Sequence, residues 1–413
     1  MMHNIKIGFF LATRQILRAS KWTTGLIIFV MVLTFLNLTV ISGVLVGLIE
    51  SSISAQRQYQ TSDVLITTLD KKEYIENTAN ILATLKSFPE VELYSARYAK
   101  SGTMEANYKE KAKETDREIT VATFAGINPE VEDRLTGISK FMVEGNYLKS
   151  DDYDQVIVGS LFVKKYTPVE SSGFTAINVK AGDKIRVTMG DVSREVTVKG
   201  IIKSKVQEVS IKVYFPEKQF RELIGRDDYN VKEIAVKLKD GADPLLVKDA
   251  LIRSGVDRYA KVKTYEDAQP KFLKDIKATF ALLGNMISSI GLVVASITIF
   301  IVIFINAITR RKYIGIMKGI GIDGVVIEIS YVIQSCFYAI CGSAIGLVIL
   351  YLLLIPYFIE HPINFPFSDG ILVAPYFETM LRMMLLVFAT IIAGYIPARM
   401  IVRRNTLDAI LGR

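Results

Sequence analysis

The feature that most constrains the fold is a pair of long uncharged stretches separated by a short basic segment. Residues 278–309 and 329–359 contain no Asp, Glu, Lys or Arg. About 20 apolar residues are enough to cross a bilayer as a helix, so each stretch is a candidate membrane span. The segment between them begins with Arg310, Arg311 and Lys312. Because cations beside a span favour the cytoplasmic side, we predict that this segment faces the cytoplasm.

Four spans are predicted in total. They cover residues 22–49, 278–309, 329–355 and 375–398. A cleaved signal peptide is the alternative for the first. Residues 22–49, however, exceed the roughly 7–15 apolar residues of a signal peptide, and no A-x-A cleavage site follows, so a retained span is favoured. Arg382 is a charge within the fourth span, and we expect its guanidinium to snorkel to the outer interface.

The distribution of charge predicts the orientation. Segments 1–21, 310–328 and 399–413 are basic, whereas the loop 356–374 holds Glu360 and Asp369 and no Lys or Arg. With four spans, both termini are then cytoplasmic, and residues 50–277 form an extracytoplasmic domain. We therefore expect a multi-pass protein of the cell (inner or cytoplasmic) membrane.

Residues 1–21 are expected to form an amphipathic helix in the membrane interface. Ile5, Phe9, Ala12 and Ile16 share one face at helical spacing. The same segment carries the cations Lys6, Arg14, Arg18 and Lys21. Membrane lipid is therefore an expected partner.

Composition excludes several classes of function. Hydrophobic residues make up 50% of the 413 and charged residues 22%, which fits membrane spans plus a large polar domain. The net charge of +8 does not indicate nucleic-acid binding, because the unbalanced cations lie beside the apolar stretches. Both cysteines, Cys336 and Cys341, lie inside one span, so no disulfide supports the polar domain.

No catalytic, cofactor or metal site is predicted. The two histidines, His3 and His361, lie far apart in the sequence, which supports neither a Ser/His/Asp arrangement nor a histidine metal site. The acidic residues 151–154 lack the glycine and terminal glutamate of an EF-hand loop.

The polar region is expected to be an α+β domain. Short runs rich in Val, Ile, Thr and Phe predict strands at Glu118–Phe124, Gln155–Val158, Lys184–Met189, Arg194–Ile202, Ile211–Phe215 and Glu233–Leu238. Residues 71–87, 217–225 and 243–254 are expected to be helical.

Short motifs follow one another in a recognisable order. They are Gly126–Pro129, Glu144–Asn146, Val156–Gly159, Ala181–Ile185, Arg310–Gly321, Gly394–Arg399 and Leu407–Leu411. With one span, a large domain and three further spans, this order resembles the FtsX-like permeases of the MacB type, the membrane subunits of a class of ATP-binding cassette (ABC) transporter. Two features depart from the family pattern. Tyr313 stands where a glutamate is frequent, and a proline is missing near Thr406–Asp408.

The resemblance implies a permease that couples ATP hydrolysis by a separate ATPase to movement of its outer domain, for export or extraction of a lipid, lipoprotein, peptide or drug. The chain lacks the G-x-x-x-x-G-K-[ST] phosphate loop, so ATP and Mg²⁺ are expected in a cytoplasmic ABC ATPase and not here. A second copy of the permease, or a homologue, is the other implied partner.

The segment 310–328 is the candidate coupling element. Its basic residues can meet acidic groups, its glycines allow tight turns or close approach, and its apolar side chains can insert into a partner surface. The candidate residues are Arg310, Arg311, Lys312, Gly315, Ile316, Met317, Lys318, Gly319 and Gly321. A basic turn that only sets the membrane topology is the alternative.

Two other features concern the helices. Gly43 and Gly47, and Gly342 and Gly346, are small-xxx-small pairs suited to helix packing within one subunit or to a dimer seam. As a helix, residues 278–309 would extend about 48 Å, against a hydrocarbon core of about 30 Å, which predicts a protruding stalk. The same layout fits a second function, a membrane-anchored receptor or regulator of an extracytoplasmic partner such as a cell-wall hydrolase.

Overall fold

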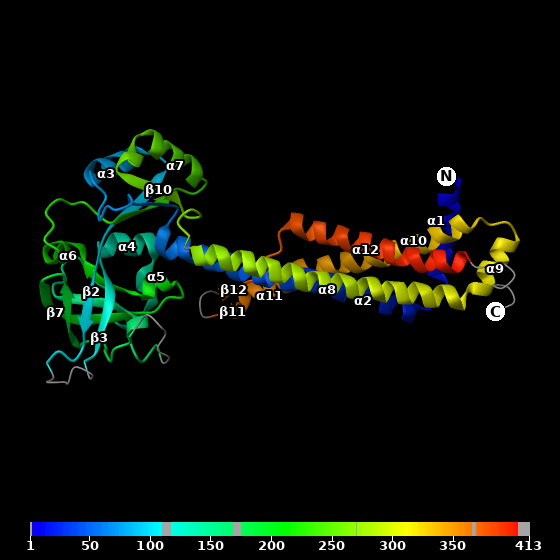
Figure 1. Ribbon diagram of the computed structural model, residues 1–413, viewed down its shortest axis with the longest axis horizontal. Helices are drawn as coiled ribbons and strands as arrows, with labels where there is room; N and C mark the ends of the chain where they lie inside the picture. Colours follow the sequence, from blue (N-terminus) through cyan, green and yellow to red (C-terminus); the bar gives the residue numbers. More distant parts are fainter. Residues whose placement is uncertain (1, 110–116, 168–174, 270, 366–368, 404–413) are drawn as a thin grey trace. The chain divides into compact units, whose positions relative to one another are not determined.

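The computed structural model describes residues 2–109, 117–167, 175–269, 271–365 and 369–403. The chain divides into two compact units. A helical unit comprises Met1–Ile49, Phe272–Asn364 and Asp369–Arg413, and a second unit comprises Glu50–Lys271 and Phe365–Ser368. Figure 1 labels many of the elements of both units.

Among its described residues, the helical unit contains four helices that are long and apolar enough to cross a membrane. Their presence confirms a multi-pass membrane protein. In chain order the elements are α1 (Met2–Leu17), α2 (Lys21–Gln56), α8 (Lys271–Thr309), α9 (Arg311–Gly319), α10 (Gly324–Ile349), a π-helical segment (Leu350–Leu354), α11 (Ile355–Glu360), β11 (Ile363–Asn364), β12 (Asp369–Gly370) and α12 (Tyr376–Val402).

Helices extend beyond the predicted spans in two places. α8 begins at Lys271, within the charged segment that precedes the uncharged stretch. The helix of the third span continues past Pro356, because the π-helical segment leads into α11 and the proline falls in the first turn of that helix. A proline is tolerated there because the first N–H groups of a helix have no intrahelical partner.

The core of the helical unit lies between α2, α8, α10 and α12. Met31, Phe35, Ile299, Ile303 and Tyr331 are among its buried residues. α1 packs against α10, since a Cβ atom on Gly8 would lie 2.6 Å from Ile329 Cγ2. Of the face expected to be apolar, Ala12 is buried, whereas Ile5 and Phe9 are exposed.

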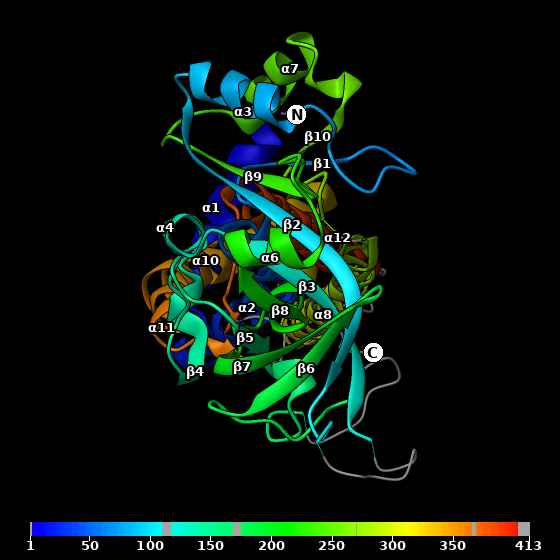
Figure 2. The same ribbon diagram turned by 90° about the vertical axis from the view of Figure 1, so that its left-hand side faces the viewer.

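The second unit is built on one extended sheet. Its strands are β1 (Val64–Thr68), β2 (Val91–Glu105), β3 (Ile119–Ile127), β4 (Met142–Gly145), β5 (Gln155–Gly159), β6 (Lys184–Met189), β7 (Val192–Ile202), β8 (Lys212–Pro216), β9 (Glu233–Leu238) and β10 (Ala260–Thr264). Their order is β10-β1-β9-β2-β3-β8-β5-β7-β4, and β6 pairs with β2 and β7. Figure 2 shows β2 as the long curved strand that runs through the whole unit.

β2 divides the sheet into two parts. Its first half pairs with β9, which continues through β1 to β10. Its second half belongs to a closed ring, because β2, β3, β8, β5, β7 and β6 each pair with the next and β6 returns to β2. Closure removes the exposed sheet edges in this part of the unit.

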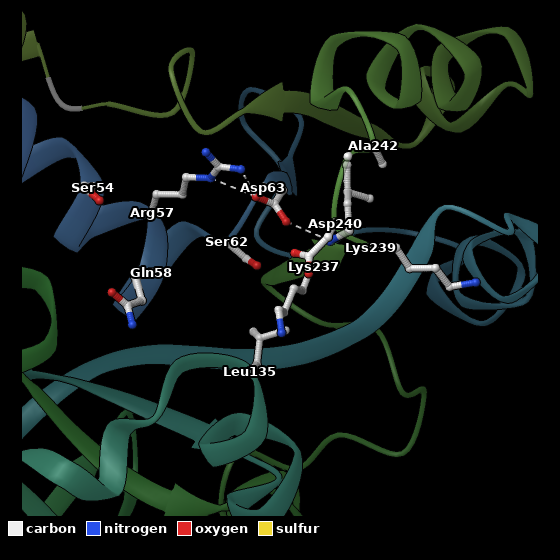
Figure 3. A pocket seen from close by; sticks show the side chains of 12 residues that line it. Ser54, Arg57, Gln58, Ser62, Asp63, Leu135, Lys237, Lys239, Asp240 and Ala242 are labelled. Atoms are coloured by element: carbon white, nitrogen blue, oxygen red, sulfur yellow. Dashed lines mark hydrogen bonds and ion pairs between the residues drawn. The ribbon is translucent and has the colours of Figure 1, made fainter.

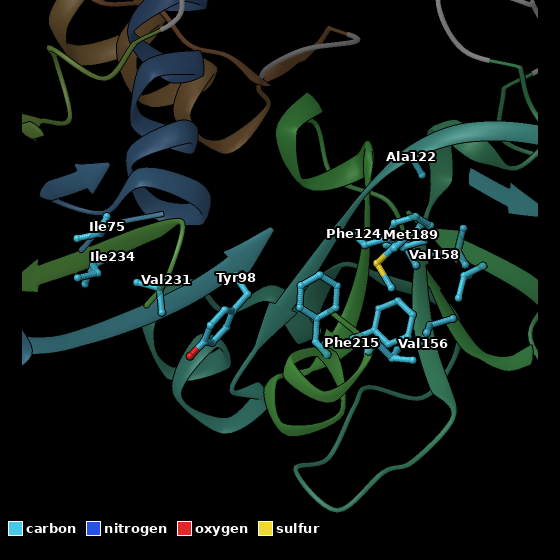
Figure 4. Packing of buried hydrophobic residues seen from close by; sticks show 14 of the residues in the cluster. Ile75, Tyr98, Ala122, Phe124, Val156, Val158, Met189, Phe215, Val231 and Ile234 are labelled. Atoms are coloured by element: carbon cyan, nitrogen blue, oxygen red, sulfur yellow. The ribbon is translucent and has the colours of Figure 1, made fainter. Parts of the chain in front are cut away.

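Helices complete the second unit. They are α3 (Thr78–Ser87), α4 (Pro129–Thr136), α5 (Gln207–Ser210), α6 (Glu217–Leu223) and α7 (Pro244–Arg253). Figure 4 shows the packed interior, where Tyr98, Phe124, Phe215 and Met189 come together. A helix α3 was expected to begin at residue 71, but Asn77 precedes its first turn in a left-handed conformation. The unit is α+β, as predicted.

Candidate coupling site

The basic segment predicted as a turn forms a short helix, α9. Arg310 separates it from α8 with a non-helical backbone (φ −100°, ψ 8°). Ile314 and Gly315 are buried, and Ile314 belongs to the core of the helical unit. The helix ends at Gly319, and Gly321 just beyond it adopts φ +94° while its N–H donates to Lys318 O at 3.0 Å. A positive φ at this position is the usual glycine role at a helix C-terminus.

An apolar face of α9 points to solvent. Tyr313 is 68% exposed, Ile316 44% and Ile320, just past the helix, 74%. Residues three and four apart share one side of a helix, so these side chains form one exposed patch. Lys312 is also exposed beside it. We call Tyr313, Ile316 and Ile320 the α9 patch.

Several candidate residues instead fasten α9 to the bundle. Lys318 Nζ donates to the main-chain oxygen of Val402, in the last turn of α12, at 2.9 Å. Met317 packs against the core. Gly319 and Gly321 are exposed, and a Cβ on either would meet nothing within 4 Å. Arg310 and Arg311 are half-buried. Candidate tail residues 407–411 lie outside the described residues.

Sequence reasoning left Tyr313 and Ile320 out of the candidate set. Their signal is helical spacing, which appears only once residues 311–319 are treated as a helix. Of the two roles expected for the glycines, tight turning or close approach, the burial of Gly315 inside α9 fits close approach.

Both glycine pairs lie at close contacts within this chain. A Cβ on Gly342 would lie 2.3 Å from Met31 Cβ, and one on Gly346 would lie 2.5 Å from Phe35 Cδ1. Gly43 and Gly47 face the main chain of Ile371 to Val373 in the loop before α12. The packing alternative accounts for these contacts, since each brings two segments of one chain together.

Arg382 points to α2. Its Nη2 donates to Ser42 Oγ at 2.7 Å and lies 3.5 Å from Glu378, one turn earlier on α12. Its side chain is 16% exposed. The guanidinium is therefore held by an interhelical hydrogen bond to α2.

A buried ion-pair network lies in the second unit, at the point where β2 passes from one part of the sheet to the other. Arg97 binds Glu132 of α4 in a bidentate arrangement, with Nε to Oε2 at 2.9 Å and Nη2 to Oε1 at 2.6 Å. Arg97 Nη1 donates to Gln60 O at 2.7 Å and to Glu233 Oε1 at 3.2 Å. Gln60 lies in the π-helical segment Arg57–Thr61 that continues α2.

Electrostatics in this network are balanced. Burial alone would lower the pKa of Arg97, but Glu132 and Glu233 outweigh it and raise the pKa above its ordinary value. Burial would raise the pKa of Glu233, yet Lys212 and Arg97 hold it below its ordinary value. Among the described residues no cluster of His, Cys, Asp or Glu could hold a metal ion. Every carboxylate of the network is paired, so its role is to fix geometry.

Two cavities flank this region. One of about 190 Å³ is lined by the network and by Tyr59, Tyr98 and Tyr214. The other, of about 360 Å³, is polar, and Figure 3 shows Arg57 joined to Asp63 at its edge. Asp63 also accepts from the N–H of Leu238 at 2.7 Å. Both cavities border the residues that follow α2.

Comparison with known proteins places this architecture. Residues 24–254 match the family model for the MacB-like periplasmic core domain, and residues 285–406 match that for the FtsX-like permease C-terminal region. The macrolide export ATP-binding/permease protein MacB of Campylobacter jejuni is 24% identical over 309 residues, covering 70% of this chain and 45% of that protein. An uncharacterized ABC transporter permease of Methanocaldococcus jannaschii is 24% identical over 287 residues, covering 65% of each.

The periplasmic region of MacB from Actinobacillus actinomycetemcomitans superposes with a TM-score of 0.36 at 14% identity, over 51% of this chain and 92% of that structure. The chain spans about half the length of the MacB relative and about two thirds of the archaeal one. The periplasmic-core model alone matches more than half of this chain, and the permease model matches the segment that holds α9. The resemblance seen in the sequence is thereby confirmed, and the chain belongs to the FtsX/MacB-type permeases.

Proposed function

We propose that this chain is the membrane subunit of an ABC transporter and that a separate cytoplasmic ATPase docks on the α9 patch. The observation that carries the proposal is the exposure of Tyr313, Ile316 and Ile320 on a helix otherwise fixed in the bundle. Protein interfaces favour a small apolar and aromatic centre with a charged rim, and Lys312 supplies a cation at this rim.

The coupling path runs through α8. Only Arg310 separates α9 from this helix, so a displacement of α9 moves the cytoplasmic end of α8. α8 has 39 residues, or about 58 Å at the helical rise. Such a helix exceeds the hydrocarbon core of about 30 Å, and its excess forms the stalk that transmits movement to the outer domain.

In this proposal both termini are cytoplasmic, in the cell (inner) membrane, residues 50–277 are extracytoplasmic, and ATP and Mg²⁺ bind the partner. Two permease subunits and two ATPases assemble. The outer domain handles a lipid, lipoprotein, peptide or drug outside the bilayer. The support is the family membership together with the basic character of α9 and its flanks.

Co-purification tests the docking surface. We expect Ile316→Asp to reduce the ABC ATPase recovered with the detergent-solubilised chain by about thirtyfold, the effect of losing a contact of roughly 2 kcal/mol. A buried carboxylate without a partner opposes binding. Ile363→Asp is the matched control, since Ile363 is also exposed and lies in β11. Equal ATPase recovery with Ile316→Asp and Ile363→Asp would overturn the proposal.

A further inference from the structure

The N-terminal segment of the helical unit carries an unbalanced cluster of cations. Residues 1–49 contain no Asp or Glu. Arg14, Arg18 and Lys21 are all exposed at the junction of α1 and α2. In the part of the chain that the structure describes, none of the three forms an ion pair. Cations without an anionic partner leave a strong positive potential at this junction.

An exposed apolar ridge begins at the same place. Trp22 is 90% exposed, and Leu26, Phe29 and Leu33 follow on α2 with exposures of 63%, 57% and 50%. Spacings of four, three and four residues place these side chains on one side of the helix. Met31 and Phe35 lie on the opposite side, against Gly342 and Gly346 of α10. The ridge is therefore separate from the packed core.

The ridge has the length of an acyl chain. Trp22 and Leu33 are eleven residues apart, which is about 16 Å along a helix. One leaflet contributes about half of the roughly 30 Å hydrocarbon core. Trp side chains favour the boundary between headgroups and acyl chains, and Lys and Arg favour the headgroup layer above it. An anionic phospholipid has the matching order of groups, with a charged head next to the cations and an acyl chain next to the apolar ridge.

We propose that Arg14, Arg18, Lys21 and Trp22 form a binding site for an anionic phospholipid, with its acyl chain along Leu26, Phe29 and Leu33. The cations bind the phosphate and any further anionic group of the head. Trp22 lies at the level of the ester linkages. The site does not depend on an ATPase partner, so it can be tested with the purified chain alone.

Trp22 is the single tryptophan of the chain, which makes it a local reporter. The full chain is reconstituted in phosphatidylcholine vesicles that contain a small fraction of either dibrominated phosphatidylglycerol or dibrominated phosphatidylcholine. Bromine quenches only a nearby tryptophan. We expect stronger quenching by the brominated phosphatidylglycerol, and we expect added salt to reduce the difference.

Substitutions test whether the preference for phosphatidylglycerol depends on the cations. Arg18→Gln and Lys21→Gln should each lower the phosphatidylglycerol preference by up to about fivefold. Arg18→Lys should retain it. Lys274→Gln is the matched control, because Lys274 is an exposed cation in the first turn of α8. Equal quenching by both lipids would overturn the proposal. So would a preference for phosphatidylglycerol that persists in the double variant Arg18→Gln/Lys21→Gln. Absence of quenching by either lipid would also overturn it, since a second copy would then cover the ridge.

Discussion

Arg97 shows how one residue holds several elements together. Its guanidinium joins β2 to α4, to β9 and to the main chain that continues α2. Its side chain is 5% exposed and that of Glu132 4%. Removing one partner of a buried pair leaves the other charge without compensation, which costs more than the pair contributes in stability. The geometry at the exit of α2 therefore depends on this single side chain.

Substituting Arg97 by methionine tests this dependence. Because Glu132 would remain buried without its cationic partner, we expect the free energy of unfolding of the second unit to fall by about 3–5 kcal/mol. The measurement is urea unfolding of the full chain in detergent, followed by pulse proteolysis. Lys72→Ala removes an exposed ion pair with Glu76 and should cost about 0.5 kcal/mol or less. Similar losses for the two variants would contradict this reasoning.

In the helical unit, close approach at glycines holds the helices together, as Arg97 does for the elements of the second unit. Gly342 brings α10 against Met31 of α2, and Gly394 brings α12 against Ser335 of α10, where a Cβ would lie 2.4 Å from Ser335 Oγ. Without a hydrophobic driving force between helices in lipid, such packing supplies much of their association.

Gly342→Ala is the smallest change that tests this packing. A methyl group 2.3 Å from Met31 Cβ and 3.1 Å from the Met31 carbonyl carbon forces the helices apart. We expect a loss of about 1–3 kcal/mol, seen as a lower temperature at which the monodisperse peak disappears in size-exclusion chromatography. Gly25→Ala is the control, because a Cβ there meets nothing within 4 Å. Alanine favours helix by up to about 1 kcal/mol, so this control should be neutral or stabilising.

Strand predictions succeeded where apolar alternation is regular. Lys184–Met189 and Glu233–Leu238 agree with β6 and β9. β2 was missed, because its residues include Arg97, Lys100 and Gly102, which weaken the strand pattern. The buried partners of Arg97 come from sites 35 and 136 residues away, so no local pattern reveals them.

The sequence indicates where the candidate site lies along the chain but not which way its side chains face. Its basic residues and glycines placed it at residues 310–321, where α9 is found. Whether each side chain faces the bundle or solvent depends on the packing of α9, since Lys318 reaches a main-chain oxygen 84 residues away. That contact is set by tertiary structure, which local periodicity does not encode.

For the whole molecule, the orientation in the membrane is the property that links all the proposals. The α9 patch meets an ATPase only in the cytoplasm, and the second unit then lies outside. The charge pattern supports this arrangement, because basic segments flank α1, α9 and the end of α12. In a chain with four spans, these three segments lie on the same side of the membrane.

Thiol labelling tests this orientation. In a background with Cys336→Ser and Cys341→Ser, which removes both native thiols, Asp191→Cys and Lys312→Cys place single cysteines at exposed positions. Asp191 follows Gly190 in the tight turn between β6 and β7, outside the buried core. With an impermeant maleimide we expect Asp191→Cys to label in intact spheroplasts. Lys312→Cys should label only after the membrane is opened, because the basic segment lies inside. Labelling of Lys312→Cys in intact spheroplasts would place the α9 patch outside, and no cytoplasmic ATPase would then reach it.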